Sequence, residues 1–569
     1  MNYKLIDGSI NDFNNVEKTI FLNRGIIKYN DYKNISDSVL YDFDLLDNIN
    51  KAVDCIEQHI NNNDHIHLIG DSDVDGYTSC AILYSYLKRY DENLNVTYSL
   101  HTKKQHGLSD DIAIPEDTQL LIIPDAGSND TEQCKKFGKD IVILDHHICD
   151  VKNPYAIIVN NQLCKYPNKQ LSGVGIVYKF LQALDDRLWN DFADDYLDLV
   201  ALGLIADNMD IRELETKRLI EKGIHNINNK LFQALCNKQS FSLGNTITPI
   251  GIQFYIVPLI NGMIRAGNSD EKDLLFKAFV EIDETFKYKK RGETEENDET
   301  IYDRVARLCG NAKARQNNYK NKSIIEVYKN INSHKFDKNK IVFGNVTTLL
   351  KPELTGITAM NVAEHYGKPC LLLRKDKKNT DLYGGSGRNI NNSSIKNLKD
   401  FLCDLNIFEY VQGHQGAFGF QIKKDNIPKA IELINEKLKD VDMSKVFYVD
   451  FILNADDLSV SLIKDIDNMR KYFGTGFQEP LICVKNICLD KEQTFIMGKE
   501  KNTWKSIVND EVAILKFKCH ENDSVINWVN KNVESNNPIK IDIIGKASIN
   551  TYKSILTPQI IIEDYQVVK

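Results

Sequence analysis

The sequence predicts an α/β protein of several domains: a parallel-sheet domain, a second α/β domain joined to it by a helical connection, and a C-terminal β-barrel. Short apolar runs alternate with helical stretches in the first third of the chain, and this alternation returns after residue 340. From residue 458 onward, short β-like runs dominate instead. Alternating strands and helices are typical of parallel sheets, and evenly spaced short strands are typical of a small barrel.

Residues 61–235 are expected to form the first α/β domain, with the helical residues 1–60 packed against it. Apolar residues at helical spacing end that N-terminal region in a helical stretch over 45–60. In the domain itself, apolar runs predict strands and the intervening stretches predict helices. The expected strands are 65–69, 96–100, 119–123 and 140–144, and the expected helices are 77–90, 130–137 and 196–206.

The rest of the chain is expected to divide into three parts. Residues 236–335 are polar and form the helical connection, in which 290–300 is a loop or surface insert. Residues 336–450 repeat the α/β pattern. Residues 451–569 fit a closed barrel, the architecture of an OB-fold.

Composition points to a globular protein of the cytoplasm with no membrane partner. Of the 569 residues, 42% are hydrophobic and 27% are charged, and no apolar run approaches the roughly 20 residues of a membrane span. The first 15 residues lack the pattern of a signal peptide. The 12 cysteines contain no CxxC pair, so neither a disulfide framework nor a zinc knuckle is indicated. A net charge of −9 still allows a local basic groove.

Acidic and histidine residues follow three of the expected strands. "GDSDVDG" (70–76) holds Asp71, Asp73 and Asp75, while the next two strands end at Asp125 and at "DHH" (145–147). The carboxyl ends of parallel strands meet at one edge of the sheet, where ligands bind. Asp207, directly after the helix 196–206, is a fourth candidate. The alternative is that these acids are separate surface residues.

So many carboxylates in one place need a cation, because unpaired charges cost several kcal/mol each on burial. Oxygen-rich ligands with histidine and without cysteine fit Mn²⁺ or Mg²⁺ better than zinc, and there are enough of them for two ions. Two ions that share a carboxylate form the clamp used for attack of water on a phosphodiester. A calcium-binding EF-hand is excluded, because Ile82 stands where its glutamate is required.

With these motifs the sequence resembles the DHH phosphoesterase superfamily, and within it the RecJ family of single-strand-specific 5′ exonucleases. "GDSDVDG", "PDAG" (124–127), "LDHH" (144–147) and "LGLIADNMDI" (202–211) match the motifs of the DHH domain. "LTGITAMNVAEHYGKPCLLL" (354–373), "GGSGRNI" (384–390) and "VQGHQGAFGF" (411–420) resemble a DHHA1 domain. "KYFGTGFQEPLI" (471–482) and 545–565 resemble the OB-fold of RecJ, so the similarity covers nearly the whole chain.

The resemblance implies a role for each residue of the metal site. Asp71, Asp73 and Asp75 contribute to the first metal, Asp125 bridges, and His146 and Asp207 complete the second ion. His147 is expected to touch the scissile phosphate or a metal, and Asp145 to orient the histidines. Asp125, Asp145 and His147 are thus the catalytic candidates. His67 matches an extra metal-binding histidine of small DHH enzymes, a ligand that RecJ proteins usually lack.

Six residues are expected to bind phosphates of the substrate. Arg388 at the end of "GGSGR" can grip a phosphate, supported by Ser386 and His414, and the glycines would let backbone N–H groups approach it; a tight turn is the alternative for the glycines. Arg265 in "PLINGMIRAG" lies near the cleft by the resemblance. The basic stretch of the family is represented only by "HTKKQHG" (101–107), where Lys103 is a candidate with Lys104. Trp504, Phe517 and Trp528 could stack on bases, although core positions suit them better.

The predicted function is metal-dependent 5′ to 3′ hydrolysis of single-stranded DNA to 5′-mononucleotides, in recombination, repair or phage DNA metabolism. A single-strand-binding protein or a helicase is the kind of protein partner to expect. Three alternatives stay open. A DHH oligoribonuclease or cyclic-dinucleotide phosphodiesterase normally lacks the barrel, a pyrophosphatase would have a different second domain, and a non-catalytic replication scaffold would have lost metal ligands.

Overall fold

The computed structural model describes residues 1–569 except 7, 9, 102–104, 109–111, 150–151, 245, 291, 293, 378, 391–392, 444, 510, 520–521, 531–537, 553–554 and 569. The chain forms two compact units, which we call the catalytic unit and the accessory unit. The catalytic unit comprises Ile20–Ala314 and Asp467–Glu479. The accessory unit comprises Met1–Thr19, Arg315–Ile466 and Pro480–Lys569.

A five-stranded parallel sheet is the centre of the catalytic unit, with the strand order β3-β2-β4-β5-β6. These are the strands that the apolar runs predict, with one further strand at the edge. In chain order they are β2 (Ile66–Gly70), β3 (Val96–Leu100), β4 (Leu120–Pro124), β5 (Asp140–Asp145) and β6 (Ile157–Asn160). β2 and β4 are buried along their whole length, as central strands of a parallel sheet are.

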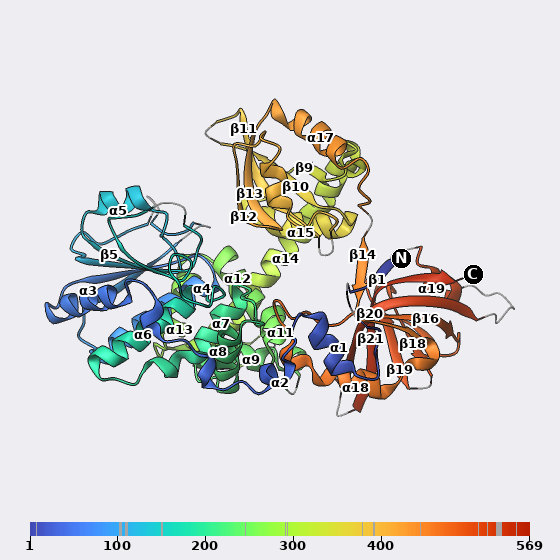
Figure 1. The fold of residues 1–569 in the computed structure, drawn as a ribbon, viewed down its shortest axis with the longest axis horizontal. Coiled ribbons are helices and arrows are strands. Elements are labelled where there is room, and N and C mark those ends of the chain that lie inside the picture. Colours follow the sequence, from blue (N-terminus) through green and yellow to red (C-terminus); the bar gives the residue numbers. More distant parts are fainter. Residues whose placement is uncertain are drawn as a thin grey trace. The chain divides into compact units, whose positions relative to one another are not determined.

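Helices cover both faces of this sheet (Figure 1). One face packs against α5 through an apolar cluster that includes Ile69, Leu121 and Cys134. α3, α4 and α6 contact the sheet through β6, β2 and β5, respectively. The helices that begin in this part of the chain are α2 (Tyr29–Lys33), α3 (Ile49–Asn61), α4 (Val74–Tyr90), α5 (Thr131–Phe137), α6 (Gly173–Leu188), α7 (Leu197–Ala206) and α8 (Leu214–His225).

The predicted connection is mostly helical, as expected, but it also contains a β-hairpin. β7 (Thr285–Tyr288) pairs antiparallel with β8 (Asn297–Thr300), so the end of the predicted insert 290–300 is a strand. The helices of this region are α9 (Lys230–Lys238), α10 (Ser240–Leu243), α11 (Pro249–Gly251), α12 (Val257–Ala266), α13 (Ser269–Phe279) and α14 (Ile301–Ser333).

The accessory unit contains the second α/β pattern as a mixed sheet with the order β12-β13-β11-β10-β9. Only β9 and β10 are parallel. The strands are β9 (Val342–Asn345), β10 (Cys370–Lys375), β11 (Leu382–Arg388), β12 (Tyr410–His414) and β13 (Ala417–Lys423). The helices are α15 (Thr355–Tyr366), α16 (Leu398–Cys403) and α17 (Asn426–Lys437).

The C-terminal region forms a mixed sheet of seven strands with the order β15-β16-β20-β21-β19-β18-β17. The strands are β15 (Phe451–Asn454), β16 (Ile482–Leu489), β17 (Thr494–Met497), β18 (Thr503–Val508), β19 (Val512–Lys516), β20 (Ile539–Tyr552) and β21 (Ile555–Val568). The helices are α18 (Val460–Asn468) and α19 (Ser524–Asn530). The predicted β-rich end of the chain is therefore confirmed.

Two segments depart from the predicted domain boundaries. Residues 1–60 were expected to be helical, but the chain begins with β1 (Asn2–Leu5), which pairs in parallel with β14 (Val446–Val449) and places Tyr3 and Leu5 against Phe447. α1 (Val16–Asn23) follows it. Asp467–Glu479, expected in the barrel, belongs instead to the catalytic unit, where Phe477 packs on Phe21 with ring centroids 5.2 Å apart.

Candidate metal centre

Three adjacent strands deliver acidic residues to one edge of the parallel sheet, as the sequence predicts. Asp71 follows β2, Asp125 follows β4, and Asp145 ends β5 with two histidines after it. The backbone N–H of Asp125 donates to the carbonyl of Leu144 at 2.8 Å, which keeps the ends of β4 and β5 in register. Asp207 directly follows α7.

Three glycines let helices approach these carboxylates closely. A Cβ atom on Gly76 of α4 would lie 2.5 Å from Cβ of Asp71. On Gly173 of α6 it would lie 2.3 Å from Oδ1 of Asp125, and on Gly203 of α7 it would lie 2.5 Å from Oδ1 of Asp75. No real side chain tolerates such distances. The site is therefore built by glycines on three helices as well as by the strand ends.

The predicted ligands form three overlapping groups, in each of which ligand atoms lie within 4.8 Å of one another. The groups are Asp71, Asp73 and Asp125; Asp75, His146 and Asp207; and Asp125, His146 and His147. Asp125 and His146 each occur in two groups. Nε2 of His146 lies 3.3 Å from Oδ1 of Asp125 and 3.4 Å from Oδ2 of Asp207. Asp125 is thus the carboxylate placed to be shared.

The donor set fits a divalent cation. Oδ1 of Asp125 and Oδ2 of Asp207 are buried and accept no hydrogen bond from the described residues. A buried carboxylate oxygen without a donor is costly, and a cation satisfies it. Oxygen ligands with one or two imidazoles match Mn²⁺ or Mg²⁺.

Burial and the repulsion between neighbouring carboxylates raise the pKa values of these carboxyls. Burial and the nearby charge of Asp75 raise the pKa of Asp125 well above its usual value. Burial, followed by the charges of Asp75 and Asp73, raises the pKa of Asp207 to about 8. Without a cation, the cluster therefore favours protonated carboxyls, and a divalent charge reverses this preference.

Asp73 and Asp75 also stabilise helices. The Asp73 side chain caps α4 by accepting the N–H of Gly76 at 3.1 Å. Asp75 accepts hydrogen bonds at the N-terminus of α6, from the N–H of Gly173 at 2.7 Å and the hydroxyl of Ser172 at 2.8 Å. Burial nevertheless raises the pKa of Asp75 to about 6.

Asp145 holds the histidine loop. Its carboxylate accepts the Nδ1–H of His147 at 2.8 Å and the N–H groups of His146 and Ser128 at 2.7 and 3.1 Å. Burial opposes ionisation of Asp145, but the hydrogen bond from His147 and the charges of His147 and His146 together outweigh burial and lower the pKa of the carboxyl. In return, Asp145 overcomes desolvation and raises the pKa of His147 to about 9. About half of the His147 side chain is exposed, so its protonated ring faces solvent.

Two histidines of the site were missed from the sequence. Nδ1 of His106 lies 2.6 Å from Oδ2 of Asp71, and the buried His101 places Nε2 4.0 Å from Oδ1 of the same carboxylate. Both lie within the basic stretch 101–107, in which only the lysines were predicted to act. Lys103 and Lys104 lie outside the described residues.

His67 is not placed as a ligand. Its ring nitrogens bond the hydroxyls of Thr97 at 2.7 Å and Ser99 at 3.0 Å, both on the neighbouring strand β3. Burial lowers the pKa of His67 to about 4, so the ring is neutral. This is the hydrogen bonding of a core histidine.

Arg265 lies near the metal ligands. It lies in the last turn of α12. Desolvation lowers the pKa of its guanidinium overall, while the Asp73 carboxylate acts to raise it. The arginine is therefore close enough to the centre for Asp73 to act on it electrostatically.

The remaining substrate candidates share one face of the β12-β13-β11 sheet. Ala417 of the central strand β13 pairs with Arg388 on the neighbouring strand β11 and with His414 on the other neighbouring strand, β12. Ser386 lies two residues before Arg388 on β11. Residues opposite one another in antiparallel strands share a face, as do residues two apart on one strand. The Arg388 guanidinium also lies against the first turn of α15, where a Cβ on Gly356 would be 2.6 Å from Nη2.

The glycines of "GGSGR" lie within β11, so the alternative of a tight turn is wrong. A Cβ on Gly387 would lie 2.2 Å from the ring of Phe418, and one on Gly385 would lie 2.0 Å from the carbonyl oxygen of Leu372. Glycine at these positions leaves space for the Phe418 ring and for the neighbouring backbone.

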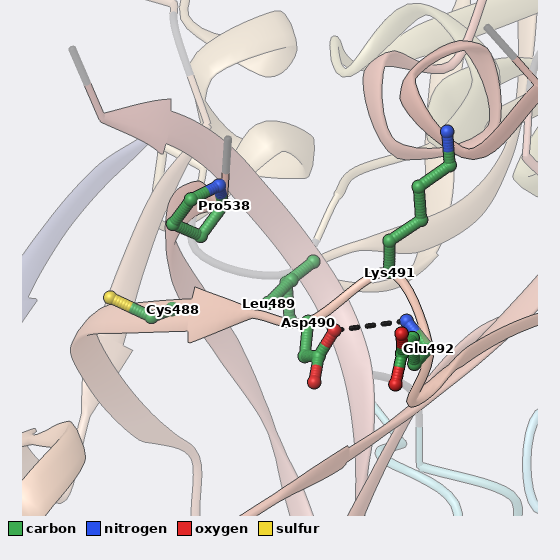
Figure 2. A pocket seen from close by; sticks show the side chains of 6 residues that line it. All are labelled: Cys488, Leu489, Asp490, Lys491, Glu492 and Pro538. Carbon is green, nitrogen blue, oxygen red and sulfur yellow. Dashed lines mark hydrogen bonds between the residues drawn. The ribbon is translucent and has the colours of Figure 1, made fainter. Parts of the chain in front are cut away.

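The three aromatic residues considered for base stacking differ in exposure. Trp504 is fully buried, whereas Phe517 is exposed and Trp528 is half-buried. Figure 2 shows a recess beside β16 in which the side chain of Asp490 accepts the N–H of Glu492 at 2.9 Å. Two carboxylates and one lysine line it, and such a lining does not attract phosphates.

Comparisons with known proteins agree with the architecture and the site. The model of the DHH family, N-terminal domain, matches residues 65–204, and the model of the RecJ OB domain matches residues 449–564. These two matches define a DHH-type protein with an OB domain. Among the described residues, none of the helices has the length and apolar character to cross a membrane.

Relatives identify the family. The SPbeta prophage-derived protein YorK of Bacillus subtilis (strain 168), whose name describes a single-strand DNA-specific exonuclease, is 38% identical over 100% of this chain and 99% of its own length. The single-stranded-DNA-specific exonuclease RecJ of the same organism is 25% identical over 93% of this chain and 64% of its length. The chain belongs to the RecJ family of single-stranded-DNA-specific exonucleases.

Solved structures share the fold. RecJ of Thermus thermophilus in complex with Mn²⁺ has a TM-score of 0.71 and 16% identity, covering 100% of this chain and 79% of that one. The same protein in complex with Mg²⁺ has a TM-score of 0.66, covering 100% and 78%. The acidic and histidine groups described above could hold such ions.

Proposed function

We propose that this protein is a metal-dependent exonuclease that hydrolyses single-stranded DNA from the 5′ end and releases 5′-mononucleotides. The observation that carries the proposal is the position of Asp125, which two ligand groups share at the carboxyl end of β4. A shared carboxylate is the arrangement that supports hydrolysis of phosphodiesters with two ions. Membership of the RecJ family supports the substrate and the polarity.

The ligands for two Mn²⁺ or Mg²⁺ ions would be Asp71, Asp73, Asp75, Asp125, His146 and Asp207. The ions would lower the pKa of a bound water and neutralise charge on the phosphate. The chain itself supplies the protonated His147 toward the open side of the site, with Asp145 as the residue that positions it. A half-exposed cation at this point suits a phosphate oxygen.

The substrate-binding roles extend to residues outside the cluster. Arg265 would contact substrate phosphates near the metal centre, Lys103 is a further candidate for phosphate binding, and Arg388 with Ser386 and His414 would bind phosphates in the accessory unit. His106 joins this proposal as the residue that holds Asp71. Phosphate contacts of this kind bind any sequence, which suits an exonuclease.

End-labelled oligonucleotides test the proposal. Single-stranded DNA and RNA, each labelled at the 5′ or the 3′ end, are incubated with purified protein and Mn²⁺ or Mg²⁺, with an EDTA arm. We expect 5′-mononucleotides from DNA, produced from the 5′ end. Activity that persists in EDTA, degradation from the 3′ end, or a clear preference for RNA or cyclic dinucleotides contradicts it.

We further propose that the protein acts in the cytoplasm, in recombination, repair or phage DNA metabolism. All 12 cysteines are free, which fits a reducing compartment. A single-strand-binding protein or a helicase remains the partner to test first, by co-purification with tagged protein from cells that carry single-stranded DNA.

A further inference from the structure

A second cluster of metal-ligating side chains lies in the catalytic unit, apart from the carboxylates described above. Cys55 and His59 are four residues apart on α3, and Asp140 is the first residue of β5. Residues at this spacing lie on one face of a helix, one above the other. The Sγ, ring nitrogen and carboxylate oxygen lie within 4.8 Å of one another. The three donors therefore converge from two elements.

The separations suit a small tetrahedral ion. Nε2 of His59 lies 3.2 Å from Oδ2 of Asp140. Two ligands held about 2.0–2.1 Å from a tetrahedral zinc are themselves roughly 3.3 Å apart, so only small movements would admit the ion. His59 is almost fully buried and Asp140 is exposed, which leaves one side open for a water as the fourth ligand.

His59 is oriented as histidine ligands are. Its other ring nitrogen, Nδ1, lies 2.8 Å from Oδ2 of Asp64, which follows α3 in the chain. Metal-binding histidines usually donate that second N–H to a carboxylate, which fixes the ring and its tautomer. With Asp64 holding Nδ1, a lone pair on Nε2 would point at Asp140.

We propose that Cys55, His59 and Asp140 form a second metal site that takes Zn²⁺, with Asp64 as the residue that positions His59. The sulfur ligand decides the class of ion, because thiolate and imidazole favour zinc whereas Mn²⁺ and Mg²⁺ favour oxygen. The bound ion would tie α3 to the start of β5, which are far apart in the sequence. This inference does not depend on the proposed nuclease activity.

Cobalt is the probe, because a cobalt–thiolate bond gives a charge-transfer absorption that the cysteine-free carboxylate centre cannot give. The full-length protein is stripped of metal with a chelator, titrated with Co²⁺, and then competed with Zn²⁺. We expect one equivalent of the thiolate band, which zinc abolishes. In the variant Cys55→Ser the band should disappear. Cys164→Ser is the matched control, since Cys164 is similarly half-buried but outside the cluster, and it should keep the band.

Two further variants keep the test sharp if Cys55→Ser does not fold. Asp140→Asn changes an exposed side chain and should weaken zinc binding at least tenfold. Asp64→Asn should weaken it about 10–100-fold while the thiolate band survives at saturating cobalt, because only the orientation of His59 changes. A wild-type protein without the band, or a band that persists in Cys55→Ser, overturns the proposal, as does unchanged zinc affinity in Asp140→Asn.

Discussion

Gly173, the first residue of α6, lies directly against Asp125: a methyl group on it would be 2.3 Å from the carboxylate oxygen Oδ1. The same glycine donates its N–H to Asp75 at 2.7 Å. The N-terminus of α6 therefore contacts two proposed metal ligands at once. Any side chain at position 173 must displace the carboxylate that two ligand groups share.

Gly173→Ala should reduce nuclease activity more than tenfold and destabilise the fold by about 1–3 kcal/mol, the usual cost of forcing a methyl group into a packed site. Activity on single-stranded DNA and urea denaturation measure the two effects. Gly175→Ala in the same helix is the control, because its nearest neighbours would be 3.2 Å away and are side-chain carbons of Leu171. Equal losses in both variants would contradict a specific effect on Asp125.

Asp125→Asn should retain less than a tenth of the wild-type rate, a loss of at least about 1.4 kcal/mol of barrier stabilisation. Asparagine keeps the shape and tolerates the left-handed backbone of this residue, whose φ is 67°. The metal-free variant should melt at a higher temperature than the wild type, because one of several mutually repelling carboxylates is gone. Asp440→Asn, at an exposed position, should change neither property. A variant with near-normal activity would refute the role of Asp125 as the shared ligand.

Metal removal should make stability fall as pH rises. Asp125 and Asp207 have raised pKa values, about 8 for Asp207, so the folded, metal-free protein holds protons that the unfolded chain releases near pH 4. Their stabilising contribution is complete below about pH 4 and is lost as pH rises toward 8. Added Mn²⁺ should therefore raise the melting temperature far more at pH 8 than at pH 5.5. An equal shift at both pH values would contradict the electrostatic account of the cluster.

Asp145→Asn tests the pairing with His147. The pKa of His147 is raised to about 9, so the pair stabilises the fold fully below the ordinary histidine value of about 6.5 and loses that contribution as pH rises through 9. The variant should be less stable than the wild type at pH 6, and the difference should shrink by pH 10. Denaturation in EDTA at several pH values measures this. His147→Gln should show the same trend, whereas a pH-independent difference would mean that only the backbone contacts of Asp145 matter.

The position of the metal centre could be predicted from the sequence, because acidic residues at the carboxyl ends of parallel strands are recognised from local patterns alone. β2, β4 and β5 are short apolar runs, and their order in a parallel sheet places Asp71, Asp125 and Asp145 at one edge. His106 was missed because it reaches Asp71 from a loop with no regular pattern. Local spacing predicts neighbours along a strand, and loops carry no such spacing.

Long-range contacts explain the other errors. β1 finds its partner β14 more than 400 residues away, and no local pattern of four residues reveals such a pairing. Likewise, the glycines of β11 are compatible with a tight turn in the sequence, whereas in the structure they lie in a strand and Gly387 packs against Phe418. The sequence shows the residue types at these places, whereas the residues that pack against them determine what they do.

Arg388→Ala should weaken DNA cleavage without weakening metal binding, because Arg388 belongs to the accessory unit and all proposed metal ligands belong to the catalytic unit. A hydrogen bond to a charged group contributes about 1.5–3 kcal/mol, so the loss in kcat/KM should be roughly ten- to hundredfold. Arg388→Lys should lose part of this kcat/KM, since a lysine offers a point charge in place of a bidentate contact.

Lys429→Ala, which removes an exposed cation of the same unit, is the control. Cleavage assays are paired with Mn²⁺ titrations monitored by thermal stability. If Arg388→Ala cleaves DNA normally, β11 does not bind the substrate; if it loses metal affinity, its defect arises at the metal centre and the assignment to phosphate binding is wrong.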